Sequence, residues 1–211
     1  MDDLPTFRLF ADPVAEGVFA RTDEPCTLCG KARGWKYIIS DYHIPEPDRP
    51  AICPWCIADG SAAARGMSFN ESWIRPEMVR KDAPDADDIA CAAIFGATPK
   101  PGLRPAGPAP ELTPEDAAEV EGRTPGFFAW QSQPWHICCG RACRYLGAAG
   151  AAELRGKWAQ AAEQINARWA KHTPGETMDY FIDKAERGGS PQAYVFECII
   201  CGRLHGELDM D

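Results

Sequence analysis

The apolar positions in the last third of the chain follow the period of an α-helix. Between residues 153 and 172 they recur at spacings of three and four, which predicts one amphipathic helix. These positions are Leu154, Trp158, Ala161, Ile165 and Trp169. The same spacing predicts a second, shorter helix, whose apolar positions are Met178, Phe181, Ile182 and Ala185. The Gly-Gly-Ser-Pro sequence at residues 188–191 ends it.

Other segments alternate between apolar and polar residues, which is typical of β-strands. Residues 5–20 alternate loosely and predict a short hairpin, and residues 35–39 (Trp-Lys-Tyr-Ile-Ile) predict a strand. Residues 193–199 and the alternating Leu204, Leu208 and Met210 predict a hairpin at the C-terminal end. Helices and strands in separate parts of one chain predict an α+β fold.

A stretch rich in proline and glycine separates the two halves. Residues 96–111 contain five prolines and three glycines, which cannot sustain a helix or a central strand. We interpret them as a flexible insertion or linker. Thr113-Pro114-Glu115-Asp116 then predicts the start of a helix, with threonine as the N-cap and proline in the first turn.

Composition and charge restrict the class of protein. The chain has 211 residues and a net charge of −9, and no apolar run approaches the length of about 20 residues that spans a bilayer. Residues 1–5 lack the basic and apolar regions of a signal peptide, so we expect a cytoplasmic protein without a membrane anchor. An acidic surface repels phosphate backbones, so nucleic acid is not an expected partner.

Eight of the ten cysteines fall into pairs with the spacing of metal ligands. The first two pairs are Cys26-x-x-Cys29 and Cys53-x-x-Cys56, which predict a four-thiolate zinc site. Four protein ligands leave no open coordination position, so we expect a structural ion and no catalysis at the metal. A cysteine pair in a knuckle, then a strand, then a pair at a helix start is typical of a treble-clef-like zinc module.

The Cys53-Pro-Trp-Cys56 sequence also permits a different function. A CPxC motif at a helix start can lower the pKa of its first thiol, as in thiol-disulfide oxidoreductases. A thioredoxin-like domain would, however, need a βαβ unit around the motif, and the Cys26/Cys29 pair would be unexplained. The redox interpretation is therefore the alternative to the zinc site.

The second predicted metal site joins the middle of the chain to its C-terminal hairpin. Cys139 and Cys143 would share one face of a helix, so we pair them with Cys198 and Cys201. A different residue could replace one of these four ligands. The candidates are Cys138, His136 and His205. Two structural zinc ions are expected in all.

Little else in the sequence indicates chemistry. Cys91 lies within Ile-Ala-Cys-Ala-Ala-Ile and is predicted to be a buried thiol that binds no metal. The sequence contains no P-loop, dinucleotide-binding fingerprint, nucleophile elbow or HExxH motif.

The motifs together resemble the CbrC family of small bacterial proteins, whose biochemical function is unknown. The resemblance rests on five stretches: Cys26-x-x-Cys29-Gly-Lys-Ala-Arg-Gly34, Ile52-Cys-Pro-Trp-Cys-Ile-Ala-Asp-Gly-Ser-Ala62, Arg123-Thr-Pro-Gly-Phe127 with Trp130-Gln131, residues 135–147, and Cys198-x-x-Cys201-Gly202. One family member is associated by name with colicin tolerance, so the resemblance implies a role in toxin tolerance. Two positions differ, because the family usually has His at Cys138 and an Asp near Arg141.

The sequence thus predicts three regions. Residues 1–75 form an N-terminal zinc module, residues 76–112 a variable region, and residues 113–211 a helical region that a zinc-ribbon-like hairpin closes. We expect a non-enzymatic zinc protein that acts through a protein partner, in stress or toxin tolerance, and a basic partner would suit its acidic surface.

Overall fold

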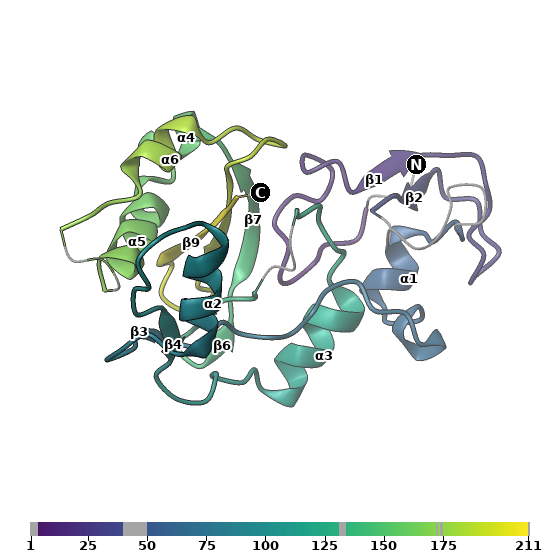
Figure 1. The fold of residues 1–211 in the computed structure, drawn as a ribbon. Helices are drawn as coiled ribbons and strands as arrows, with labels where there is room; N and C mark the ends of the chain where they lie inside the picture. The colour runs from purple at the N-terminus through teal and green to yellow at the C-terminus, as the bar shows by residue number, and fades with distance from the viewer. Residues whose placement is uncertain (1–3, 40–49, 131–133, 172, 174, 211) are drawn as a thin grey trace.

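A computed structural model describes residues 4–39, 50–130, 134–171, 173 and 175–210 (Figure 1). The mixed α+β fold that the sequence predicts is confirmed. The elements in chain order are β1 (Phe19–Arg21), β2 (Trp35–Tyr37), α1 (Pro54–Ala58), the 3₁₀-helix η2 (Ala63–Arg65), β3 (Met78–Arg80), α2 (Ala86–Ile94), β4 (Leu103–Pro105), α3 (Pro114–Arg123), β5 (Ile137–Cys138), β6 (Arg141–Ala142), β7 (Arg144–Ala149), α4 (Ala151–Arg155), α5 (Ala159–Ala170), α6 (Asp179–Lys184), β8 (Gln192–Glu197) and β9 (Leu204–Asp209).

An antiparallel sheet of three strands, in the order β7-β8-β9, forms the centre of the protein. The predicted C-terminal hairpin is present as β8 and β9, which pair from Gln192↔Asp209 to Glu197↔Leu204. Both faces of β8 are buried, and its side chains alternate between two hydrophobic clusters. Ala193 and Val195 belong to one cluster and Tyr194 and Phe196 to the other.

Helices α4, α5 and α6 cover the face of the sheet that carries Ala193 and Val195 (Figure 1). The sequence predicts one helix over residues 153–172, and this is wrong in one respect. The helix is interrupted between α4 and α5 at Gly156, where φ is −116° and ψ is −114°, outside the helical region. The apolar spacing continues across this break, which is why periodicity does not reveal it. Residue 172, the predicted end, lies outside the described residues.

An aromatic cluster covers the opposite face and joins it to the N-terminal part of the chain. The Phe127 ring stacks on Tyr145 at a centroid distance of 3.9 Å, and Phe10 meets Tyr145 edge-on at 4.9 Å. The predicted hairpin within residues 5–20 does not form as expected. Residues 19–21 instead pair with residues 35–37 as β1 and β2, with Phe19 opposite Tyr37. Phe7 and Phe10 form only an isolated antiparallel bridge. A separate turn follows, which closes with a 3.0 Å hydrogen bond from the Val18 amide to the Pro13 carbonyl.

The variable region forms a small ribbon on the surface. β3 and β4 pair antiparallel, and α2 begins with a capping box between Asp85 and Asp88. Residues 96–111 are largely exposed, yet they include β4, whose proline lies in a two-stranded ribbon rather than in a central strand. The predicted N-cap of α3 is confirmed, because the Thr113 side chain accepts a hydrogen bond from the Asp116 amide at 3.1 Å.

One of the two hydrophobic clusters contains residues from more than one of the regions predicted from the sequence. One cluster unites Cys26, Ile57, Val120 and Phe196, which come from the first and third predicted regions. No helix within the described ranges is long and apolar enough to cross a membrane.

Candidate metal centres

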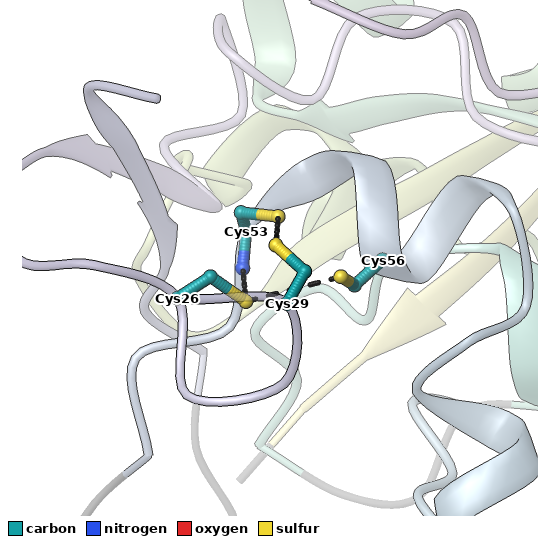
Figure 2. Close-up of side chains that lie close together, drawn as sticks. All are labelled: Cys26, Cys29, Cys53 and Cys56. Atoms are coloured by element: carbon teal, nitrogen blue, oxygen red, sulfur yellow. Dashed lines mark hydrogen bonds between the residues drawn. The ribbon is translucent and has the colours of Figure 1, made fainter. Parts of the chain in front are cut away.

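The first group of thiols has the spacing of a tetrahedral site (Figure 2). The Sγ atoms of Cys26, Cys29, Cys53 and Cys56 all lie within 4.8 Å of one another. The Cys26–Cys56 and Cys29–Cys53 sulfur pairs are both 3.8 Å apart. Four sulfurs placed about 2.3 Å from a central zinc ion would be about 3.8 Å apart, so the group fits that ion. None of the four cysteines forms a disulfide.

Two local structures present these thiols. The Cys26–Gly30 knuckle closes with a 2.7 Å hydrogen bond from the Gly30 amide to the Cys26 carbonyl, and Gly30 has the positive φ (70°) that this turn requires. Cys53 is the N-cap of α1, and Pro54 occupies its first turn. The Cys53 amide also donates to Cys26 Sγ at 3.3 Å.

Backbone amides prepare Cys26 to be a thiolate. Burial would raise the pKa of Cys26, but the amides of Cys29, Cys53 and Leu28 outweigh it and lower the pKa to about 7. Burial raises the pKa of Cys53 and of Cys56. Cys26 therefore ionises more readily than Cys53 and Cys56. A cation bound among the four sulfurs would stabilise the thiolate form of Cys53 and Cys56 as well.

The second group of thiols lies between the central hairpin β5–β6 and the β8–β9 turn. The ligand atoms of Cys138, Cys139, Cys198 and Cys201 all lie within 4.8 Å of one another. Cys138 Sγ is 3.9 Å from Cys139 Sγ and 3.8 Å from Cys201 Sγ, which again matches the edge of a four-thiolate tetrahedron. These cysteines are also free of disulfides.

The Cys198–Gly202 turn repeats the knuckle of the first group. The Gly202 amide donates to the Cys198 carbonyl at 2.9 Å, and Gly202 has a φ of 72°. The amides of Ile200 and Cys201 each donate to Cys198 Sγ at 3.4 Å. Burial opposes them, yet they lower the pKa of Cys198 to about 6. Both groups thus contain one knuckle with the same backbone conformation.

The pairing of Cys139 with Cys143 is the part of the sequence prediction that the structure does not reproduce. The prediction assumed a helix, whereas residues 137–142 form a hairpin with Cys138 opposite Arg141. Its two turn residues, Cys139 and Gly140, have φ angles of 51° and 73°, as a type I′ turn requires. This turn places Cys138 with Cys139, and Cys143 remains outside the group of four. The Cys139-Gly140 sequence was the signal that could have revealed the turn.

The remaining candidate residues lie elsewhere. Cys143 is fully buried in the aromatic core. Its burial is the main cause that raises its pKa, and the neighbouring thiolates of the second group raise this pKa further. His136 and His205 lie side by side, with ring centroids 5.7 Å apart, but neither belongs to the group of thiols. Cys91, predicted to be buried, is exposed on α2, because no residue of that helix is buried.

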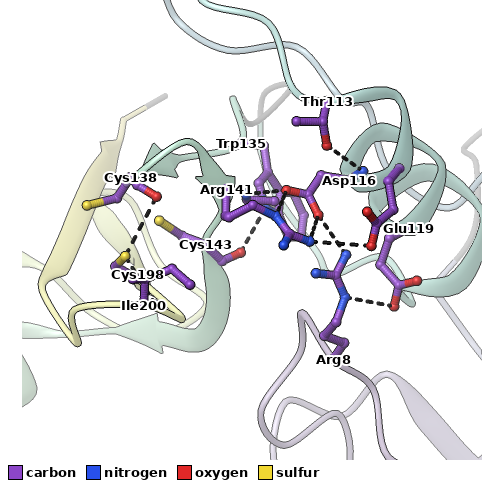
Figure 3. Close-up of polar contacts among 12 residues, drawn as sticks. Arg8, Thr113, Asp116, Glu119, Trp135, Cys138, Arg141, Cys143, Cys198 and Ile200 are labelled. Atoms are coloured by element: carbon purple, nitrogen blue, oxygen red, sulfur yellow. Dashed lines mark hydrogen bonds and ion pairs between the residues drawn. The ribbon is translucent and has the colours of Figure 1, made fainter.

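A buried carboxylate that the sequence analysis did not identify holds the β5–β6 hairpin in place (Figure 3). Asp116 on α3 is fully buried. Its Oδ2 accepts hydrogen bonds from Arg141 Nε and the Ala142 amide, both at 2.9 Å. Its Oδ1 accepts from Arg8 Nη2 at 2.7 Å and Arg141 Nη2 at 2.9 Å. The resemblance to the CbrC family leads us to expect an Asp near Arg141. The structure shows that this arginine pairs with Asp116.

Comparison with known proteins shows the family to which the chain belongs. The chain belongs to UPF0167, described as an uncharacterised protein family, whose profile matches residues 4–210. A UPF0167 protein of Pseudomonas aeruginosa is 36% identical over 207 residues, which cover 98% of this chain and 97% of the relative. A UPF0167 protein of Mycobacterium bovis is 31% identical over 202 residues, covering 94% and 89%. No solved structure matches the chain.

The two cysteines Cys138 and Cys143 allow a direct test of the second group. We expect Cys138→Ser to lower the zinc content from two ions per chain to one, because a member of the tetrahedron is removed. Cys143→Ala, the matched control, should retain both ions. Native mass spectrometry and elemental analysis measure the content. Loss of zinc from the Cys143 variant alone would instead favour the helical pairing.

A second prediction concerns Asp116. We expect Asp116→Asn to lower the free energy of unfolding by about 3 kcal/mol, because two guanidinium groups lose a buried charged partner. Glu115→Gln, an equal charge change at a largely exposed neighbour, should have little effect. Urea unfolding of both variants provides the measurement.

The pH dependence of that difference follows from the pKa of Asp116. The hydrogen bonds from Arg141 lower this pKa below its ordinary value of 3.8. Burial acts in the opposite direction, whereas the Ala142 amide and Arg8 lower the pKa further. The stabilisation is therefore fully present above the ordinary value and is lost as the pH falls toward the lowered one. A difference between wild type and Asp116→Asn that grew on acidification would contradict this assignment.

Proposed function

We propose that this protein is a structural zinc protein, with one ion in each group of four cysteines, that acts by binding a protein partner. The single observation that supports the zinc assignment is the sulfur spacing, which in both groups matches a tetrahedron of four thiolates. In this proposal residues 26–56 form a treble-clef-like module and the β8–β9 knuckle a zinc-ribbon-like one.

The positions of the two groups support a structural role. Each links segments that are far apart in the sequence, and residues 22–34 between β1 and β2 contain few buried side chains apart from Cys26. Metal binding would supply the folding energy that such loop-rich segments lack. Four protein ligands leave no coordination position for a substrate.

The variable region supports a role in partner binding. No residue of α2 is buried, and Ile89, Ile94 and Phe95 expose 52%, 78% and 78% of their surface. Asp85 is the N-cap of α2 and Asp87 lies in its first turn, so both precede Ile89 at the N-terminal end of this helix. An apolar surface with acidic neighbours, on a chain of charge −9, favours a partner that is basic and partly apolar. The resemblance to the CbrC family adds stress or toxin tolerance, for which a basic nuclease toxin is a fitting partner.

The alternative function, a thiol-disulfide oxidoreductase that uses Cys53 and Cys56, has less support. A catalytic pair needs an accessible thiolate with a lowered pKa. Cys53 and Cys56 are 2% and 3% exposed, and burial raises the pKa of each thiol. Their sulfurs also lie within the first group of four, where zinc would occupy their lone pairs.

We therefore expect the zinc-loaded protein to show negligible disulfide reductase activity in thioredoxin-coupled and glutathione-coupled assays. The assay is best made in a Cys91→Ser background, because Cys91 is an exposed thiol outside both groups. Activity that appears on chelation should accompany loss of structure. Turnover by the folded protein, abolished by Cys53→Ser at unchanged zinc content, would make the protein an oxidoreductase.

The partner surface can be tested by site-specific photocrosslinking. A photoreactive phenylalanine analogue at position 95 should capture a basic protein, and capture should weaken as ionic strength rises. Ile94→Ser should reduce it. The same analogue at Tyr180, which is 69% exposed on α6, is the control. Equal capture from both positions, or capture of another copy of this chain, would contradict the proposal.

A further inference from the structure

A cavity of about 310 Å³ lies where five segments of the chain meet, one of which contributes only Pro110. Residues 74–78 form one wall and residues 134–137 another, the end of α5 contributes Arg168 and Lys171, and β9 contributes Glu207. The size lies at the lower end of the range for small-molecule sites. We propose that this cavity is a binding site for a small organic anion, with a carboxylate or phosphate group and a compact apolar body. The proposal rests neither on the metal centres nor on the partner surface.

The walls of the cavity are built by the fold. The Trp135 amide donates to the Trp73 carbonyl at 2.9 Å, and Ile74 forms a parallel bridge with Trp135. This bridge holds residues 74–78 beside residues 134–137. The apolar part of the lining is Ile74, Pro76, Met78, Pro110, Pro134, Trp135 and Ile137. Prolines and a strand bridge give a wall that needs little ordering when a ligand binds.

One carboxylate fixes two guanidinium groups at the cavity. The Glu207 side chain is only 11% exposed, and its Oε1 lies 3.2 Å from Arg75 Nη2. Its Oε2 accepts a hydrogen bond from Arg168 Nη1, and Arg168 Nη2 also donates to the Gly206 carbonyl at 2.9 Å. Arg75 and Arg168 remain 45% and 35% exposed. A guanidinium carries five N–H donors, so both groups are held in place with donors left for a ligand.

The charge of the lining selects an anion. Arg75, Arg168 and Lys171 oppose the two carboxylates of Glu77 and Glu207, which leaves one net positive charge in formal terms. The chain as a whole carries −9, so the formal charge of the lining is opposite in sign to that of the whole protein. A concave site with cations at its rim concentrates small anions even on an acidic protein.

A buried nitrogen of the lining also lacks a partner. His136 Nε2 has no hydrogen-bond partner among the described residues, and the Glu207 Oε2 atom is 3.8 Å away. Unsatisfied buried polar atoms are uncommon in folded proteins. His136 is therefore a buried polar residue of the lining, beside the Glu207 carboxylate.

Calorimetric titration of the folded full chain tests the proposal. The probes are benzoate, phenyl phosphate, inorganic phosphate and benzamidine, the last of which pairs the same ring with a cation. We expect benzoate or phenyl phosphate to bind with millimolar affinity or tighter, and the stronger of the two identifies the head group. Failure of both to bind, or preferential binding of benzamidine, would overturn the proposal. Inorganic phosphate binding as tightly as phenyl phosphate would overturn the assignment of an organic ligand.

Variants then locate the site. Arg75→Gln and Arg168→Gln should each weaken binding by about tenfold or more, because a charge-assisted bond is lost. Glu207→Gln should strengthen it, because the guanidinium groups lose their competing anion. Arg155→Gln, an equal change in the ion pairs with Asp179 and Asp183 on the helical layer, should leave affinity unchanged. Circular dichroism and the midpoint of urea unfolding confirm that each variant is folded. Affinity unaffected by both Arg75→Gln and Arg168→Gln in folded protein would place binding elsewhere and overturn the site.

Discussion

The buried carboxylate of Asp116 is the interaction on which the arrangement of the central segments depends. It accepts hydrogen bonds from Arg8, from Arg141 and from the Ala142 amide, and it thereby joins the N-terminal segment, α3 and the β5–β6 hairpin. A charge buried in this way is tolerated only when all its partners are in place. Because the same hairpin carries Cys138, the position of the second thiol group follows from this carboxylate.

The central strand β8 packs against both hydrophobic clusters. Its alternating side chains serve a helical core on one face and an aromatic core on the other, so the sheet cannot slip in register without exposing both. The turn after β8 carries the second knuckle, and β9 carries Glu207. The β8–β9 hairpin therefore positions Cys198 and Cys201 of the second group at its turn, and Glu207 of the cavity on β9.

The sequence predicted different parts of the structure with different success. The first thiol group was predicted in full, because its two Cys-x-x-Cys pairs are local and each pair fixes its own geometry. The second was predicted for three of four members. Choosing between Cys138 and Cys143 required the turn at Cys139 and Gly140, and a short apolar stretch does not distinguish a hairpin from a helix by spacing alone. The break at Gly156 was missed for a similar reason, because the apolar period persists across it.

Residue spacing by itself determined the α+β class, the gathering of the first four paired cysteines and the start of α3, since these depend on contacts within a few residues. Tertiary structure alone decided which residues meet over long distances. Asp116 with Arg8, and Glu207 with Arg75 and Arg168, are brought together by the packing of segments that the sequence keeps far apart. No local pattern marks such residues, because a single buried acid in a helix or strand resembles any exposed one until the fold supplies its partners.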